Sequence, residues 1–159
     1  MNPVLLNLVR VGAVGCGLMA GVFFAFSVAV MPALTRLPPP DGMAAMQAIN
    51  RAILNPVFLV VFVGTALTTA AIAVSTLWTW DDGGAALRLS GGLSYLVGAF
   101  ALTAAYHVPR NDALDQLDAA APSSAEKWAG YLAEWVPWNH VRAAASTASL
   151  VLFVIACRS

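Results

Sequence analysis

Charged residues are scarce in this sequence. Eight Lys and Arg with eight Asp and Glu make up 10% of the 159 residues, whereas 60% are hydrophobic. A soluble domain has roughly 25% charged residues, so this chain has too little polar surface to stay in water. The formal net charge is zero, which argues against a nucleic-acid partner. The composition therefore predicts one small membrane domain over residues 1–159.

Cysteine and histidine are equally scarce. Cys16 and Cys157 do not form a Cys-x-x-Cys pair, which excludes dithiol chemistry on quinones, and we expect both to be apolar core residues. The two histidines, His107 and His140, lack His-x-x-x-His or Glu-x-x-His spacing. The sequence therefore predicts no metal site, although two histidines near carboxamides keep a metal ion as an alternative. No Gly-x-Gly-x-x-Gly fingerprint of a dinucleotide site occurs.

Charge is absent from four windows of the chain. Three are long enough for the about 20 helical residues that cross a bilayer. These three are residues 11–35, 52–80 and 89–109. The fourth window, Ala143 to Cys157, has only 15 residues, so the last helix must begin near Trp138. We predict an all-α, multi-pass integral membrane four-helix bundle with both termini on the same side and helices at about residues 6–30, 56–78, 86–106 and 138–157.

Prolines and glycines predict boundaries and contacts of these helices. Met31-Pro32 and Pro109 are expected to end the first and third helices, because proline cannot donate the next backbone hydrogen bond. Asn55-Pro56 is a typical start of the second. In the first helix, Gly17 and Gly21 predict a close approach of another helix.

The two longer connections are expected to contain short interfacial helices. The first covers about residues 42–53 after a cap at Asp41. The second covers about residues 124–136 and opens with the capping box Ser123-Ser124-Ala125-Glu126.

Polar residues gather at one predicted depth of the membrane. A helix that begins near Trp138 places Asn139, His140 and Arg142 at the hydrocarbon edge, where an arginine costs up to ~3 kcal/mol. Other helix ends bring further polar residues to this level, namely Asn50, Asn55, His107 and Asn111. We interpret the set as a polar vestibule beneath the two connections. Aromatic side chains could wall a flat apolar ligand there: Phe23, Phe26, Trp128, Tyr131, Trp135 and Trp138.

These residues also have structural interpretations. The tryptophans and Tyr131 fit an interfacial aromatic belt, the asparagines fit helix caps, and Arg142 could reach lipid phosphate. On ideal helical geometry Asn139 and Arg142 share a stripe with two serines, and His140 lies off it. His140 and Arg142 therefore share a pocket only if the last helix begins irregularly near Pro137, and otherwise His107 is the better candidate base.

Three stretches carry a family resemblance. They are residues 24–34 with 45–50, His107-Val108-Pro109-Arg110-Asn111-Asp112-Ala113-Leu114, and Trp135-Val136-Pro137-Trp138-Asn139-His140-Val141-Arg142. In order and spacing they resemble the anthrone oxygenase-like family of small four-helix membrane proteins. The matching positions are Asn50, Asn111, Trp135, Asn139, His140 and Arg142. That family often has asparagine where this chain has His107.

The resemblance implies oxidation of an anthrone to an anthraquinone with O2 and without flavin or nicotinamide. The expected roles are a base at His140 or His107, oxyanion donors at Arg142 with Asn139 or Asn111, and stacking by the tryptophans. Two other readings stay open. One is a non-catalytic membrane protein that binds a lipid, a quinone or a partner, and the other is a metal-dependent membrane oxidoreductase. The sequence also leaves a homo-oligomer open.

Overall fold

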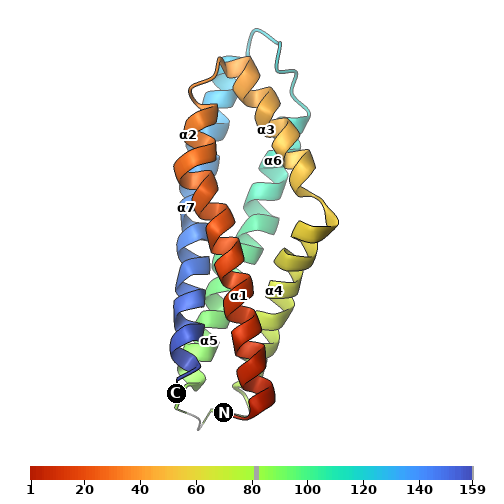
Figure 1. Ribbon diagram of the computed structural model, residues 1–159. Coiled ribbons are helices and arrows are strands. Elements are labelled where there is room, and N and C mark those ends of the chain that lie inside the picture. Colours follow the sequence, from red (N-terminus) through yellow and green to blue (C-terminus); the bar gives the residue numbers. More distant parts are fainter. Residues whose placement is uncertain (81–82, 159) are drawn as a thin grey trace.

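The computed structural model describes residues 1–80 and 83–158, and the regular structure in these ranges is helical throughout, which confirms the predicted fold class. Four helical units are long and apolar enough to cross a membrane: Pro3–Leu34, Pro56–Ser75, Ala85–Asp115 and Ser124–Ala156. Figure 1 shows an elongated bundle with both chain termini at one end. We call this the terminal end. The opposite end is the distal end.

Two of the units contain π-helical segments. The first unit consists of α1 (Pro3–Ala25), η1 (Phe26–Val30) and α2 (Met31–Leu34). The third consists of α5 (Ala85–Tyr95), η2 (Leu96–Ala101), η3 (Thr103–His107) and α6 (Val108–Asp115). The remaining helices are α3 (Pro39–Ile53), α4 (Pro56–Ser75) and α7 (Ser124–Ala156).

The predicted helix ends at Met31-Pro32 and Pro109 are wrong, because helical structure continues past both prolines. The N–H of Met31 donates to the carbonyl of Phe26, and the N–H of Val108 donates to that of Thr103, each five residues earlier. In a regular α-helix the proline ring would clash with the carbonyl four residues before it. A wider π turn just ahead of each proline accommodates the ring, so the chain keeps its direction.

A separate interfacial helix at 124–136 is also not formed. Residues 124–156 are one helix that runs through Pro137, and Ser123 lies at its cap position without a side-chain capping hydrogen bond. Its 33 residues span about 50 Å, well beyond the ~30 Å hydrocarbon core. A bilayer crossed by α7 would therefore leave part of this helix outside the hydrocarbon.

The first connection forms α3, which begins after Pro38 and places Asp41 in its first turn rather than at its cap. In Figure 1 α3 runs from the distal tip back along the bundle towards α4. It packs on α6 and α7. The cap of α4 is formed as predicted, since Asn55 Oδ1 accepts a 3.0 Å hydrogen bond from the N–H of Phe58. The chain therefore bends at Leu54 and Asn55, between two helices that together line one side of the molecule.

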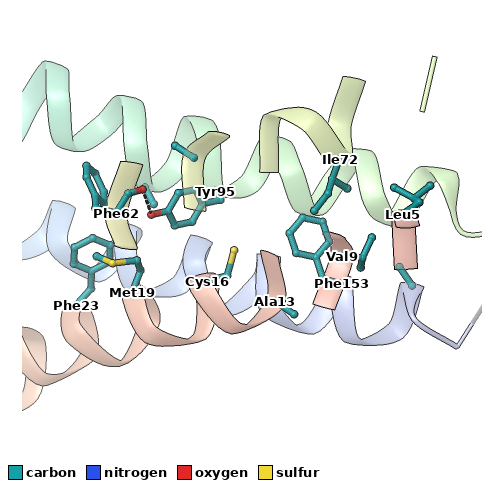
Figure 2. Close-up of a cluster of buried hydrophobic side chains, with 13 residues drawn as sticks. Leu5, Val9, Ala13, Cys16, Met19, Phe23, Phe62, Ile72, Tyr95 and Phe153 are labelled. Atoms are coloured by element: carbon teal, nitrogen blue, oxygen red, sulfur yellow. Dashed lines mark hydrogen bonds between the residues drawn. The ribbon is translucent and has the colours of Figure 1, made fainter. Parts of the chain in front are cut away.

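The main core lies between the four long units. Helix α1 packs against α4 and α7, and α5 packs against the same two helices. Figure 2 shows the apolar side chains that meet there, including Phe153, Ile72 and Val9. The hydroxyl of Tyr95 donates a 3.2 Å hydrogen bond to the carbonyl of Phe62 (Figure 2). Cys16 is buried in this core as expected, whereas Cys157 is half-buried.

The closest helix contacts occur at glycines other than the predicted Gly17 and Gly21, although a Cβ atom on Gly17 would lie 3.5 Å from Leu150 of α7. A Cβ atom on Gly21 would meet nothing within 4 Å, so the predicted close approach there is wrong. A Cβ atom on Gly98 would lie 2.5 Å from the Cβ of Ala145, and one on Gly15 would overlap Thr65. These two glycines allow α7 to approach η2 and α4 to approach α1.

Candidate functional site

The guanidinium of Arg142 lies inside the bundle. Only 5% of this residue is exposed. Its Nη2 donates a 2.7 Å hydrogen bond to Asn139 Oδ1, and its Nη1 donates a 3.2 Å bond to Thr103 Oγ1. The guanidinium carbon also lies 4.4 Å from the ring centroid of Phe23 and 5.1 Å from that of Trp135, distances typical of cation–π contacts.

Asn139 holds this arginine in place. It is fully buried, and its Nδ2 donates to the carbonyl of Phe23 at 2.9 Å and to Ser27 Oγ at 2.8 Å. Two of the oxygen acceptors in this network, Ser27 and Thr103, belong to π-helical segments of different units. Segments of this kind often occur at functional sites.

The predicted polar stripe of α7 faces the interior. It consists of Asn139, Arg142, Ser146 and Ser149, all buried. The spacing of three and four residues places these side chains on one face of a regular helix. Ser149 donates a 2.7 Å bond to the carbonyl of Gly91, so the terminal part of the stripe fastens α7 to α5. The distal part holds the arginine.

Arg142 lines a cavity of about 150 Å³, which we call the inner cavity. Apolar and aromatic side chains form most of its wall, with a few polar groups: Val22, Phe23, Phe26, Ile49, Asn50, Ile53, Leu54, Phe58, Leu59, Phe62, Thr103, Val108, Asn111, Trp135 and Arg142. Within the structure as described, Arg142 is the one charged residue among them. The cavity lies beside the bend between α3 and α4.

No ion pair to Arg142 forms within residues 1–80 and 83–158, and its Nε has no hydrogen-bond partner there. A charge taken out of water without an opposite charge is costly, by several kcal/mol even after relaxation. The nearby oxygens and aromatic rings offset part of this cost but supply no negative charge. The inner cavity is therefore an apolar site with an unneutralised positive charge in its wall.

Asn111 and Asn50 supply the other polar groups of the inner cavity. Asn111 Oδ1 accepts two 2.9 Å hydrogen bonds, from Tyr131 Oη and from Trp135 Nε1. This holds the indole of Trp135 at the cavity wall. Asn50 is 9% exposed, and its Nδ2 has no partner among the residues described.

Some of the predicted aromatic residues line the inner cavity and others do not. Trp135 and Phe26 are wall residues, 5.9 Å apart between ring centroids. Trp128 and Tyr131 stack in the distal core, with centroids 5.6 Å apart. Tyr131 in turn stacks on Trp135, with centroids 6.3 Å apart. Trp138 is 43% exposed and contacts Tyr106 on the outside of the bundle.

Neither histidine lines the inner cavity. His107 is fully buried with its ring edge-on to Trp135, its Nδ1 3.5 Å from the carbonyl of Leu102 and its Nε2 without a partner in the described chain. His140 is exposed. Because α7 remains helical through Pro137, the irregular start that would bring His140 beside Arg142 does not occur.

The described residues also contain no group of three His, Cys, Asp or Glu side chains that could hold a metal ion.

Comparison with known protein families gives a match. The family described as anthrone oxygenase matches residues 57–152, which is more than half of the chain. The chain belongs to the anthrone oxygenase family. No curated protein and no solved structure matches it.

The family match covers one side of the inner cavity. It includes Arg142, Asn139, Trp135 and Asn111. Wall residues from α1, η1 and α3 lie outside the matched range, and Phe26 and Asn50 are among them. The cavity is thus completed by the part of the chain that the match does not reach.

Several groups of the site are not predicted by the sequence. Thr103 and Phe62 are wall residues, and Ser27 fixes Asn139. Thr103 could have been noticed because it lies one helical turn before His107 in an otherwise apolar stretch. Phe62 carries no such signal, since it is one apolar residue among many in α4.

Proposed function

We propose that the protein oxidises a flat aromatic substrate of the anthrone type to the corresponding quinone with O2. In this reaction the methylene carbon loses two hydrogens and gains one oxygen atom. The second oxygen atom leaves with the two hydrogens as water, so O2 accepts four electrons in all. The first step is removal of a methylene proton, which leaves a negative charge spread over the rings and the ketone oxygen.

The unpaired, buried guanidinium of Arg142 is the observation that carries this proposal. It is positioned before the substrate arrives, by Asn139 and Thr103. A negative oxygen that forms in the inner cavity would receive a charge-assisted hydrogen bond and neutralise the buried charge. Interactions that strengthen as charge develops lower the barrier of the step that creates the charge.

The cavity wall suits the rest of such a substrate. Phe23, Phe26 and Trp135 present aromatic surface next to the guanidinium. An engineered cavity of about 150 Å³ in another protein holds a benzene molecule. The inner cavity is of that size, so we expect it to take the ring that carries the oxygen. The remaining rings would extend past Ile53 and Leu54, where the wall reaches the surface.

The proposal requires O2 as co-substrate and no flavin, nicotinamide or metal. Electron transfer from an electron-rich carbanion to O2 needs no organic cofactor. Oxygen consumption that falls when chelator-treated protein is assayed, and returns with one metal, would contradict this part of the proposal.

The test is oxygen uptake by the purified protein in detergent on addition of a hydroxylated anthrone. We expect Arg142→Ala to reduce uptake above the spontaneous rate by about 10²–10³-fold, the range seen when an oxyanion donor is removed. Arg142→Lys keeps the charge but not the planar fork, and should be intermediate. His140→Ala, on the exposed face of the same helix, is the matched control and should keep wild-type uptake.

A binding protein without turnover is the second candidate, because the inner cavity as described has no carboxylate or imidazole in its wall. It would hold an apolar molecule with a negatively charged oxygen, such as an ionised quinol or a lipid. In that case Arg142→Ala would weaken binding of the hydroxylated anthrone, and wild-type uptake would equal the spontaneous rate.

A further inference from the structure

The proposed reaction needs a group that takes the methylene proton, and the inner cavity does not supply one. Its single charged wall residue, as far as the chain is described, is Arg142, which is a donor. The proton must therefore leave towards another part of the molecule. This inference rests on the proposed function and concerns the same site.

A second cavity adjoins the first. This outer cavity has a volume of about 110 Å³ and is lined by Asn50, Arg51, Ile53, Leu54, Val108, Asn111, Asp112 and Asp115. Five of these residues also line the inner cavity: Asn50, Ile53, Leu54, Val108 and Asn111. The two cavities thus share a wall whose polar groups are two carboxamides.

Asn50 marks the connection between the cavities. It is about nine-tenths buried, lines both cavities, and its Nδ2 has no hydrogen-bond partner in the described chain. A buried polar group without a partner is costly, and an ordered water usually satisfies it. A water at Asn50 would stand between the substrate and the outer cavity.

The two carboxylates of the outer cavity differ in their partners. Asp115 forms an ion pair with Arg51, which ties α6 to α3. Asp112 forms no hydrogen bond or ion pair with the residues described, and its side chain lies one helical turn before Asp115 on the same face of α6. Asp112 is therefore the carboxylate that is free to accept a proton.

We infer that Asp112 accepts the methylene proton through water held at Asn50 and Asn111. The C–H bond of the methylene breaks, its electron pair stays on the substrate as the anion beside Arg142, and the proton passes through water to the Asp112 carboxylate. Solvent then takes the proton from Asp112, because that residue is exposed. A positive group on one side and a proton acceptor on the other would separate the charges that this step creates.

Other charged groups near α6 fit this assignment. Arg51 from α3 faces the outer cavity but is engaged by Asp115. Arg110 turns to the other side of α6, where its guanidinium lies 3.4 Å from the ring centroid of Tyr106 and its Nε donates a 2.7 Å bond to Glu134. From α7, Arg142 is the charged group that faces the inner cavity. The other candidate acceptors among the described residues are less suited, because Asp115 is engaged by Arg51 and His107 lines neither cavity.

The test compares oxygen uptake of wild type, Asp112→Asn, Asp112→Glu and the matched control Asp118→Asn with a hydroxylated anthrone. Asp118 lies in the α6–α7 connection and lines neither cavity. At neutral pH we expect Asp112→Asn to lose about 10²-fold in kcat, Asp112→Glu to lose less, and Asp118→Asn to be unchanged. Replacing the methylene hydrogens by deuterium should slow Asp112→Asn more than wild type.

A second arm raises the pH until the anthrone is ionised in solution. There the proton is already lost, so Asp112→Asn should reach the wild-type rate above the spontaneous one, while Arg142→Ala stays defective. Equal uptake of Asp112→Asn and wild type at neutral pH would overturn the inference. So would a loss that is the same at every pH, which indicates a structural effect. Wild-type uptake equal to the spontaneous rate would instead refute the proposed function itself.

Discussion

At the scale of single residues, Asn139 both joins helices of the bundle and positions Arg142 of the candidate site. One side chain joins α7 to α1 and η1 through its Nδ2 and fixes Arg142 through its Oδ1. Its depth and its position on the polar stripe were predicted from the sequence. Its partners were not, because the carbonyl of Phe23 and the hydroxyl of Ser27 are brought to it by helix packing.

Asn139→Ala should therefore lower the stability of the bundle. It removes two interhelical hydrogen bonds, which average about 0.6 kcal/mol each in membrane proteins, so we expect a loss of about 1–2 kcal/mol in the free energy of unfolding. Unfolding in detergent, followed by circular dichroism, measures this loss. Asn7→Ala is the control, since Asn7 is exposed and bonds only Arg10 in the described chain. A variant as stable as the control would show that Asn139 does not join the helices.

The histidines show the limit of residue-level prediction. The sequence predicts that His107 and His140 lie at one level of the bundle and near the ligand. In the structure His107 is buried edge-on to Trp135, and His140 is exposed on the surface. Depth follows from counting residues along a helix, but the facing of a side chain at a helix end depends on whether the helix is continuous. Continuity of α7 through Pro137 decides it for His140.

At the scale of elements, prolines do not end the helices as the sequence predicts, and only some glycines allow a close helix approach. A proline in a sequence predicts a helix end, but π turns ahead of Pro32 and Pro109 let the helices continue. A glycine predicts a close approach only where another helix faces it. Among the glycines, Gly98 of η2 faces Ala145 of α7, whereas Gly21 of α1 faces open space.

We expect Gly98→Ala to destabilise the bundle and Gly21→Ala to leave it unchanged or slightly more stable. The new methyl at position 98 would lie 2.5 Å from the Cβ of Ala145, and overpacking of this kind costs about 1–3 kcal/mol. At position 21 the substitution meets no neighbour and gains up to about 1 kcal/mol of helix propensity. Thermal unfolding of both variants in the same detergent gives the comparison, and the reverse order of stabilities would contradict the packing described here.

At the scale of the whole molecule, the helices differ in length. Helix α4 has 20 residues and matches a hydrocarbon core of ~30 Å, whereas α7 has 33. A bilayer matched to α4 would leave the distal parts of the other units outside the hydrocarbon. The inner cavity, which includes Phe58 and Phe62 near the start of α4, would then lie at the membrane edge. The proposed apolar substrate would then reach the cavity from the lipid.

Four crossings, as the sequence predicts, would place both termini on one side of the membrane and the α6–α7 connection on the other. Single cysteines at positions 7 and 118, in a background without Cys16 and Cys157, test this with a membrane-impermeant thiol reagent on sealed vesicles. We expect one of the two positions to be labelled from outside and the other only after the vesicles are opened. Labelling of both from outside would contradict the four-crossing topology.

The sequence by itself determined the all-helical class and the number of long apolar segments, because each depends on composition and residue spacing along one helix. The tertiary structure decided which polar side chains face one cavity, that Arg142 lacks an acidic partner in the described chain, and that Asp112 stands beside the site. These depend on how helices far apart in the sequence rotate against one another. Spacing along a chain does not fix that rotation, and side-chain packing does.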